Sequence, residues 1–193
     1  MTSKWNYLPL TSEEQKLELE LARRYSNCTP VSELLVQRGI TSVAEAEKFF
    51  HPSLRDLHDP FLMPDMDKAV DRINRAMGSK EKILVYGDYD VDGTTAVSLV
   101  YRYLQNFYSE IDFYIPTRYD EGYGISKSTI DRAAEEDVKL IIILDCGIKA
   151  IDEIKYAATR GIDFIICDHH VPDAELPPAA AILNPKLEGS TYP

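Results

Sequence analysis

The sequence predicts an α/β protein with a mostly parallel five-stranded sheet flanked by helices, behind a helical N-terminal leader. From Lys82 onward, apolar runs alternate with helical segments, which is typical of strands joined by crossovers. The runs 139–144 and 163–167 are continuous and apolar, as expected for strands covered on both faces. The chain has 193 residues, 45% of them hydrophobic, which is enough for one good core.

Residues 1–80 have helical patterns throughout. Thr11-x-x-Glu14 and Ser42-x-x-Glu45 both match a capping box, in which two residues satisfy the first N–H groups of a helix. Apolar residues between positions 66 and 77 recur at helical spacing, and Gly78 then ends that helix. We therefore expect a leader over residues 1–80 and a second domain over residues 81–193.

The second domain is expected to alternate strands and helices. The apolar runs predict strands at 82–87, 111–115, 139–144, 163–167 and 179–183. The segments between them predict helices at 94–108, 126–136 and 149–160. Because the strands are joined by crossovers, their carboxyl ends should meet at one edge of the sheet, where open α/β folds bind ligands.

An acidic motif, Gly-Asp-Tyr-Asp-Val-Asp-Gly, directly follows the first strand. Its carboxylates, Asp88, Asp90 and Asp92, repel one another unless a cation lies among them. Such hard oxygen ligands suit Mg²⁺, Mn²⁺ or Ca²⁺. An EF-hand calcium loop begins similarly, but it follows a helix and needs an acid at its twelfth position, which is Leu99 here. The remaining alternative is a solvated acidic turn.

Two further strand ends carry side chains that bind metals. Asp145 follows the third strand, and Asp168-His169-His170 follow the fourth. A histidine pair is often only a surface feature, but here it abuts an apolar strand, and Asp168 can orient an imidazole. Because three strand ends all carry side chains that can bind metal, we predict one metal site at this edge of the sheet.

Composition limits the remaining possibilities. The net charge of −11 argues against a broad basic face for nucleic acid, but it does not exclude a nuclease, because a metal cluster itself needs acids. The three cysteines, Cys28, Cys146 and Cys167, are most simply reduced thiols of a cytoplasmic protein. A zinc site using Cys146, Cys167 and the histidines is the weaker alternative, because cysteines beside Ile and Leu in a strand usually act as small core residues. No apolar run is long enough for a membrane span, and the N-terminus lacks the apolar core of a signal peptide.

Two segments beside the acids are candidates for holding a phosphate. Thr94 and Thr95 are expected to begin a helix, so that its N–H groups face the acids. The loop after the second strand carries candidates for gripping a backbone phosphate or stacking a base: Arg118, Gly122, Tyr123 and Gly124. A plain connection is nearly as good an interpretation of this loop. Other cations nearby are Lys127, Arg132 and Lys149.

These motifs resemble a known family. The segments 87–93, 145–147 and 168–170 look like the first three signature motifs of the DHH phosphoesterase superfamily. The segments 34–40, 49–54, 60–63 and 118–124 resemble more narrowly the RecJ family of single-strand-specific DNA exonucleases. The resemblance covers nearly the whole chain.

The resemblance implies a two-metal phosphodiesterase, typically using Mn²⁺ or alternatively Mg²⁺. By position, Asp90 and Asp92 would hold different ions, Asp145 would bridge them, and His169 would be a ligand. Asp88 would be a ligand or a supporting acid. The chemistry implied is in-line attack by an activated water on the phosphate, with the metals neutralising charge.

His170 would sit near the scissile phosphate and donate to it, and Asp168 would support the histidines. The implied substrate is single-stranded DNA, degraded 5′ to 3′ during recombination and repair. The family is longer than this chain, so we expect a fragment whose parent adds a fourth motif and a C-terminal lobe. Other branches have a histidine where this chain has Tyr86, which is a poor ligand when neutral.

Three alternatives remain open. A DHH-type enzyme could cleave cyclic dinucleotides, very short RNA or pyrophosphate instead. A response-regulator receiver would use Asp88, Asp90, Asp145 and Lys186, but it leaves Asp92 and the histidine pair unexplained. A catalytically inactive fragment with a role only in folding or docking is the third.

Overall fold

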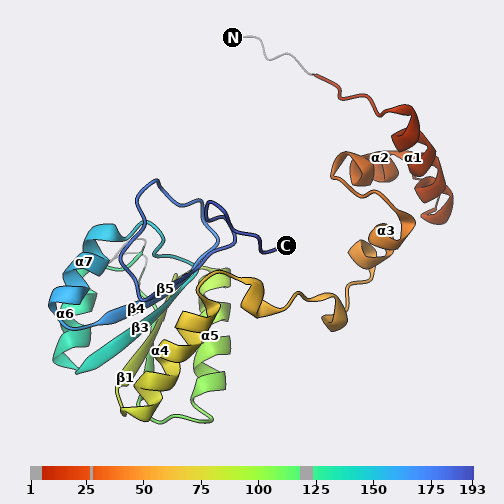
Figure 1. The fold of residues 1–193 in the computed structure, drawn as a ribbon. Helices are drawn as coiled ribbons and strands as arrows, with labels where there is room; N and C mark the ends of the chain where they lie inside the picture. Colours follow the sequence, from red (N-terminus) through yellow and green to blue (C-terminus); the bar gives the residue numbers. More distant parts are fainter. Residues whose placement is uncertain (1–5, 27, 118–123) are drawn as a thin grey trace. The chain divides into compact units, whose positions relative to one another are not determined.

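The computed structural model describes residues 6–26, 28–117 and 124–193. The chain forms two compact units, Met1–His58 and Asp59–Pro193 (Figure 1). The sequence places the division at residue 80 instead. The difference is helix α4 (Met66–Gly78), whose Ala69 and Ala76 are buried in the core of the second unit. Across the described ranges, every helix is too short or too polar to act as a transmembrane segment.

The first unit is helical, as expected. It contains α1 (Ser12–Arg24), α2 (Thr29–Gln37), α3 (Val43–Phe50) and the short 3-10 helix η1 (Leu54–Asp56). Its small core consists of Leu21, Leu35, Val36 and Ala46. The capping box at Thr11 is confirmed. At Ser42 only half of the box forms, because the Glu45 carboxylate accepts from the N–H of Thr41 and not from that of Ser42.

The second unit is built on a five-stranded sheet in the order β2-β1-β3-β4-β5. The strands are β1 (Lys82–Gly87), β2 (Ile111–Tyr114), β3 (Val138–Leu144), β4 (Asp163–Cys167) and β5 (Ala181–Leu183). Every pairing between them is parallel, so the predicted α/β fold is confirmed. The chain reverses its direction of winding between β1 and β3, and such a switch point is where this topology binds ligands.

Helices cover both faces of the sheet, which explains why the strands are apolar throughout (Figure 1). On one face, α4 and α5 (Val91–Leu104) pack against side chains that include Ile83, Val85 and Ile142. On the other, α6 (Lys127–Glu135) and α7 (Ile151–Thr159) pack against side chains that include Leu84 and Ile143. Successive residues of β1 therefore enter opposite cores.

Arg72 fastens α4 to the amino-terminal edge of the sheet. It is 4% exposed, and its guanidinium lies 2.7 Å from both the Asp163 and Glu81 carboxylates. It also donates to the Lys139 carbonyl at 3.3 Å. A buried cation is tolerated only when paired in this way, so Arg72 fixes the helix against the starts of β3 and β4.

Candidate metal centre

The register of the sheet brings three aspartates to one level of its carboxyl edge. Gly87 of β1 pairs with Leu144 of β3, and Leu144 pairs with Cys167 of β4. The residues that follow these three are Asp88, Asp145 and Asp168. The convergence that the sequence predicts is therefore a consequence of the parallel register.

The turn from β1 into α5 is tight because two glycines allow close approach. A Cβ atom on Gly93 would lie 2.4 Å from the carbonyl oxygen of Asp88 and 2.6 Å from its backbone nitrogen. A Cβ on Gly87 would lie 2.4 Å from Cγ2 of Val97. The first turn of α5 therefore packs directly on the backbone of the acidic motif, and only glycine fits at position 93.

Helix α5 begins earlier than the sequence predicts. Asp90 is its N-cap, and its Oδ1 accepts from the N–H of Gly93 at 3.0 Å. The prediction that Thr94 and Thr95 begin the helix is wrong. The Thr94 N–H and hydroxyl both donate to the Asp90 carbonyl, at 3.0 and 2.7 Å, and the helix begins at Val91.

Asp88 supplies a buried carboxylate, one oxygen of which lacks a donor among the described residues. The residue is 4% exposed, and its Oδ1 has no hydrogen-bond partner among the residues that the structure describes. A buried carboxylate oxygen is costly unless a donor or a cation satisfies it. This atom therefore fits the expected role of Asp88 as a ligand or supporting acid.

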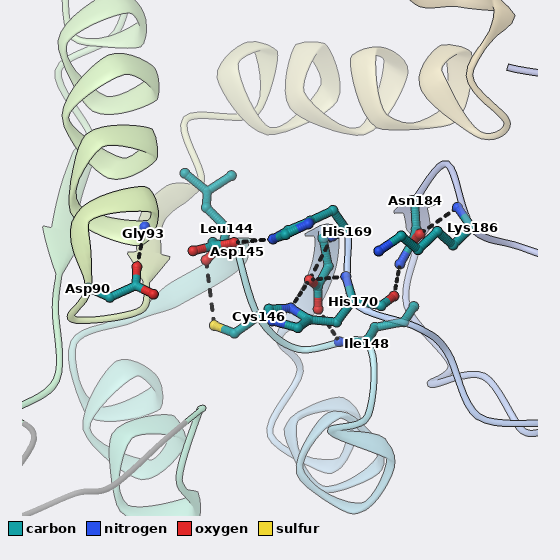
Figure 2. Close-up of polar contacts among 11 residues, drawn as sticks. Asp90, Gly93, Leu144, Asp145, Cys146, Ile148, His169, His170, Asn184 and Lys186 are labelled. Atoms are coloured by element: carbon teal, nitrogen blue, oxygen red, sulfur yellow. Dashed lines mark hydrogen bonds and ion pairs between the residues drawn. The ribbon is translucent and has the colours of Figure 1, made fainter. Parts of the chain in front are cut away.

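Asp145 and the histidine pair form a cluster of possible metal ligands (Figure 2). The Oδ1 of Asp145 lies 3.1 Å from Nε2 of His169, and ligand atoms of Asp145, His169 and His170 all lie within 4.8 Å of one another. Asp145 has a left-handed backbone with φ of 61°, which is uncommon for a residue other than glycine. Such a conformation persists only where its surroundings hold it, and it is frequent at functional sites.

Asp168 is a structural anchor for both histidines. Its side chain is 1% exposed and accepts from the N–H groups of His169 at 2.7 Å, His170 at 3.0 Å and Ile148 at 3.1 Å. It also lies 2.7 Å from Nδ1 of the His170 ring. Burial acts to raise the pKa of Asp168, but the hydrogen bonds from His170 and Ile148 outweigh it and lower the pKa below its ordinary value. Asp168 is thus held as an anion that orients the His170 ring.

The acids of the motif act on Asp145 electrostatically. Burial raises the pKa of the Asp145 carboxyl above its ordinary value. The charges of Asp90 and Asp92 also raise it, and the two histidines oppose them. These two acids lie close enough to be felt by Asp145, although they lie outside the tight cluster of Asp145 and the histidines. A divalent cation between the two groups would relieve this repulsion.

The cysteines of the sheet are core residues. Cys146 is fully buried, and burial, with the nearby charges of Asp168 and Asp88, raises the pKa of its thiol. Burial raises the pKa of the Cys167 thiol to about 12. Both thiols therefore stay protonated, and within the described ranges the group of metal-competent side chains contains neither cysteine. The core interpretation is favoured over the zinc site.

Tyr86 is not oriented as a ligand. The residue is fully buried, and its hydroxyl donates to the Gly124 carbonyl at 2.7 Å. Gly124 has a φ of +79°, which favours glycine at this end of the loop. The other loop candidates, Arg118, Gly122 and Tyr123, lie outside the described residues.

A pocket of about 450 Å³ opens beside His170. The residues that line it are Gly124, Ile125, Gly147, Ile148, Lys149, Ala150, Glu153, Asp168 and His170. Lys149 is thereby placed near the site, and its Nζ pairs with Asp173 at 3.1 Å. Arg132 lies 3.8 Å from the centre of the Tyr114 ring and lines a different hollow.

One residue of the site was missed by sequence reasoning. Asn184 is fully buried directly after β5, and its side chain reaches the backbone of His170 (Figure 2). Its only sequence signal is an amide residue at the end of the fifth apolar run.

The sheet is wholly parallel, and carboxylates and imidazoles meet at its switch point. These side chains are the ligands of a divalent-metal centre, so the fold and the site together indicate an α/β protein that binds divalent metal. Residues 82–191, more than half of the chain, match the family model described as the N-terminal domain of the DHH family. The chain belongs to the DHH family. The match confirms the resemblance to the DHH superfamily. It also excludes the interpretation as a response-regulator receiver, which the strand order alone would have allowed.

Among proteins of known name, the chain is similar in sequence to RecJ exonucleases. The chain is 45% identical over 163 residues to the single-stranded-DNA-specific exonuclease RecJ of Bacillus subtilis, covering 84% of this chain and 21% of that protein. It is 33% identical over 161 residues to the RecJ of Escherichia coli, covering 83% of this chain and 27% of that protein. The chain therefore spans about a fifth to a quarter of the length of these relatives.

Two solved structures are similar in fold. The crystal structure of exonuclease RecJ bound to manganese has a TM-score of 0.63 and 28% identity, covering 69% of this chain and 34% of that one. The crystal structure of RecJ from Thermus thermophilus in complex with Mn²⁺ has a TM-score of 0.65 and 22% identity, covering 89% of this chain and 23% of that one. Both support the fold described above.

Proposed function

We propose that this chain carries the first part of the catalytic centre of a RecJ-type exonuclease that degrades single-stranded DNA with divalent metal ions. The observation that carries the proposal is the meeting of two strand ends at the switch point of the sheet: β3 ends at the Asp145–His169 pair, and the adjacent β1 ends at Asp88, whose buried Oδ1 has no hydrogen-bond partner in the described part of the chain. The named relatives and the manganese-bound neighbour support the same function.

The acids and His169 would hold two Mn²⁺ or Mg²⁺ ions. Asp90 and Asp92 would contribute carboxylates from the start of α5, Asp145 would contribute one from the end of β3, and the buried Asp88 would be a further ligand or a supporting acid. When bound, such ions neutralise charge on a phosphate and lower the pKa of water enough to make it a nucleophile.

His170 acts next to this centre. Because Nδ1 lies on the Asp168 carboxylate, the ring presents Nε2 to a phosphate oxygen or to the leaving group. Asp168 would thus assist the transfer by orienting the His170 ring, without contacting the substrate.

The DNA strand is expected to enter over the loop and the helix start. Arg118, Gly122, Tyr123 and Gly124 would grip the backbone or stack a base. The net charge of −11 argues against a broad basic surface on this chain. The remaining part of the longer protein, a C-terminal lobe, is therefore proposed to supply the opposing side of the DNA channel. We place the protein in the cytoplasm, in DNA recombination and repair.

The proposal is tested on the full-length protein with 5′- and 3′-labelled single-stranded oligonucleotides. We expect Mn²⁺-dependent release of nucleotides, lost in Asp145→Ala and strongly reduced in His170→Ala. His51→Ala is the matched control, because this exposed histidine lies in the first unit. Absence of single-strand nuclease activity together with hydrolysis of a cyclic dinucleotide would replace the proposal with the small-substrate alternative. The 193-residue chain alone should be weakly active or inactive, because positioning of the strand contributes much of the rate.

A further inference from the structure

A buried amide holds the backbone of the catalytic histidine. Asn184 is fully buried, and its Nδ2 donates to the carbonyl oxygen of His170 at 2.9 Å (Figure 2). Its Oδ1 accepts from the N–H of Lys186 at 2.8 Å. Both polar atoms of the amide therefore have partners. Because Oδ1 accepts from Lys186, it is the Nδ2 group that faces His170.

The end of β5 anchors the whole Asp168–His170 turn. The N–H of Asp168 donates to the Leu183 carbonyl at 3.0 Å, one residue before Asn184. The side chain of Asp168 then holds the N–H of His170, and Asn184 holds its carbonyl oxygen. The peptide groups on either side of His170 are thus both fixed by buried polar side chains, which leaves the ring little freedom to move relative to Asp145.

The chemistry of this contact requires an amide. A carboxylate at position 184 would still accept from Lys186, but it would place a negative charge against the His170 carbonyl oxygen in place of a donor. Replacement of a buried donor that leaves its acceptor unsatisfied is costly, and the backbone must shift to relieve it.

We infer that Asn184 is a positioning residue for the reaction: it sets the place of the His170 ring without touching the substrate or the metals. The inference rests on the proposed function for its kinetic consequence, but its structural part stands separately. Displacement of a catalytic group by about 1 Å can lower the rate on the order of a hundredfold.

The structural part is tested by NMR of the 193-residue chain with ¹⁵N-labelled histidine. The chain has four histidines, so each ring can be assigned with single His→Gln variants. In Asn184→Asp we expect the ring signals of His170 to shift, with those of His51 and His58 unchanged. Asn106→Asp is the matched control, because Asn106 also donates from Nδ2 to backbone carbonyls, at the end of α5, and should move no ring signal.

The kinetic part is tested on the full-length protein. We expect Asn184→Asp to lower kcat by on the order of 10- to 100-fold, with KM and the affinity for Mn²⁺ within about twofold of wild type. Asn184→Ser, which is neutral and smaller, should fall between the two. A parallel loss of Mn²⁺ affinity would show a general disruption of the site and overturn the inference.

The remaining outcomes are also decisive. Unchanged His170 ring signals in a folded Asn184→Asp chain would refute the positioning role. Loss of cooperative unfolding in both variants would make Asn184 a residue of the fold and likewise overturn the inference. If the wild-type protein has no nuclease activity, the proposed function fails, while the NMR comparison still decides whether Asn184 positions His170.

Discussion

Gly93 offers the sharpest test of how the fold builds the site. Alanine normally stabilises a helix relative to glycine by about 1 kcal/mol. At position 93 the added Cβ would lie 2.4 Å from the carbonyl oxygen of Asp88, where an ordinary contact is 3.4–4 Å. The atoms that it meets belong to the backbone and cannot rotate away. The start of α5 must therefore move by about 1 Å, and overpacking of this kind typically costs about 1–3 kcal/mol.

The shift would also be felt at the metal centre, because Asp90 and Asp92 belong to the same turn of α5. We expect Gly93→Ala to lower the free energy of unfolding by about 1–3 kcal/mol in urea and to weaken Mn²⁺ binding in calorimetry. The control is Gly78→Ala at the end of α4, where the added Cβ meets no atom within 4 Å. This variant should be as stable as wild type or up to about 1 kcal/mol more stable, with unchanged Mn²⁺ binding.

The reasoning fails if Gly93→Ala matches wild type in both stability and Mn²⁺ affinity, since the close packing of α5 on the acidic motif would then have no consequence. A loss of stability without any change in Mn²⁺ binding would refute the link between the glycine and the metal centre.

Three further predictions concern the same unit. Saturating Mn²⁺ should raise the thermal midpoint of the chain, because Mn²⁺ at a hundredfold excess over Kd stabilises the folded state by about 2.7 kcal/mol. The midpoint should rise less in Asp92→Asn than in the control Asp173→Asn, and equal shifts would contradict a role for Asp92. Tyr86→Phe should cost about 1 kcal/mol in urea denaturation through the hydrogen bond to Gly124 and leave Mn²⁺ affinity unchanged; a loss of Mn²⁺ binding would show that Tyr86 serves the metal. Arg72→Ala should cost about 1.5–3 kcal/mol, because the Lys139 carbonyl and the partly exposed carboxylates of Asp163 and Glu81 lose their charged donor at the opposite edge of the sheet; a loss below about 0.5 kcal/mol would show that these contacts are unimportant.

The sheet was predictable because its strands are buried on both faces. All five expected strands form within two residues of their predicted bounds, and the parallel register then brings Asp88, Asp145 and Asp168 together. Continuous apolar runs carry this information directly. The acids meet at the carboxyl edge of the sheet because crossover connections make the strands parallel, which brings all of their carboxyl ends to one edge.

The start of α5 was not predictable in the same way. A run of aspartates after a strand suggests a loop, and the pattern of a metal site gave no sign that Asp90 also serves as the N-cap of α5. Similarly, the helical spacing of residues 66–77 predicts α4 but does not say what its apolar face packs against. Its contacts with the sheet, made by Ala69 and Ala76, place it in the second unit.

Asn184 could not be found from the sequence because its importance depends on a contact across the fold. It reaches His170, 14 residues earlier in the chain, through a hydrogen bond that exists only once β5 has paired with β4. The Oδ1 of Asp88 is a similar case, since only the folded structure shows that this atom is buried with no donor from residues 6–26, 28–117 and 124–193.

The most direct test of the metal centre is anomalous diffraction at the manganese edge from crystals of this chain grown with Mn²⁺. The account predicts a strong peak within coordination distance of the Asp145 carboxylate and the His169 ring, with Asp88, Asp90 or Asp92 completing the ligands. Peaks found only away from the carboxyl edge of the sheet, at a saturating Mn²⁺ concentration, would contradict it.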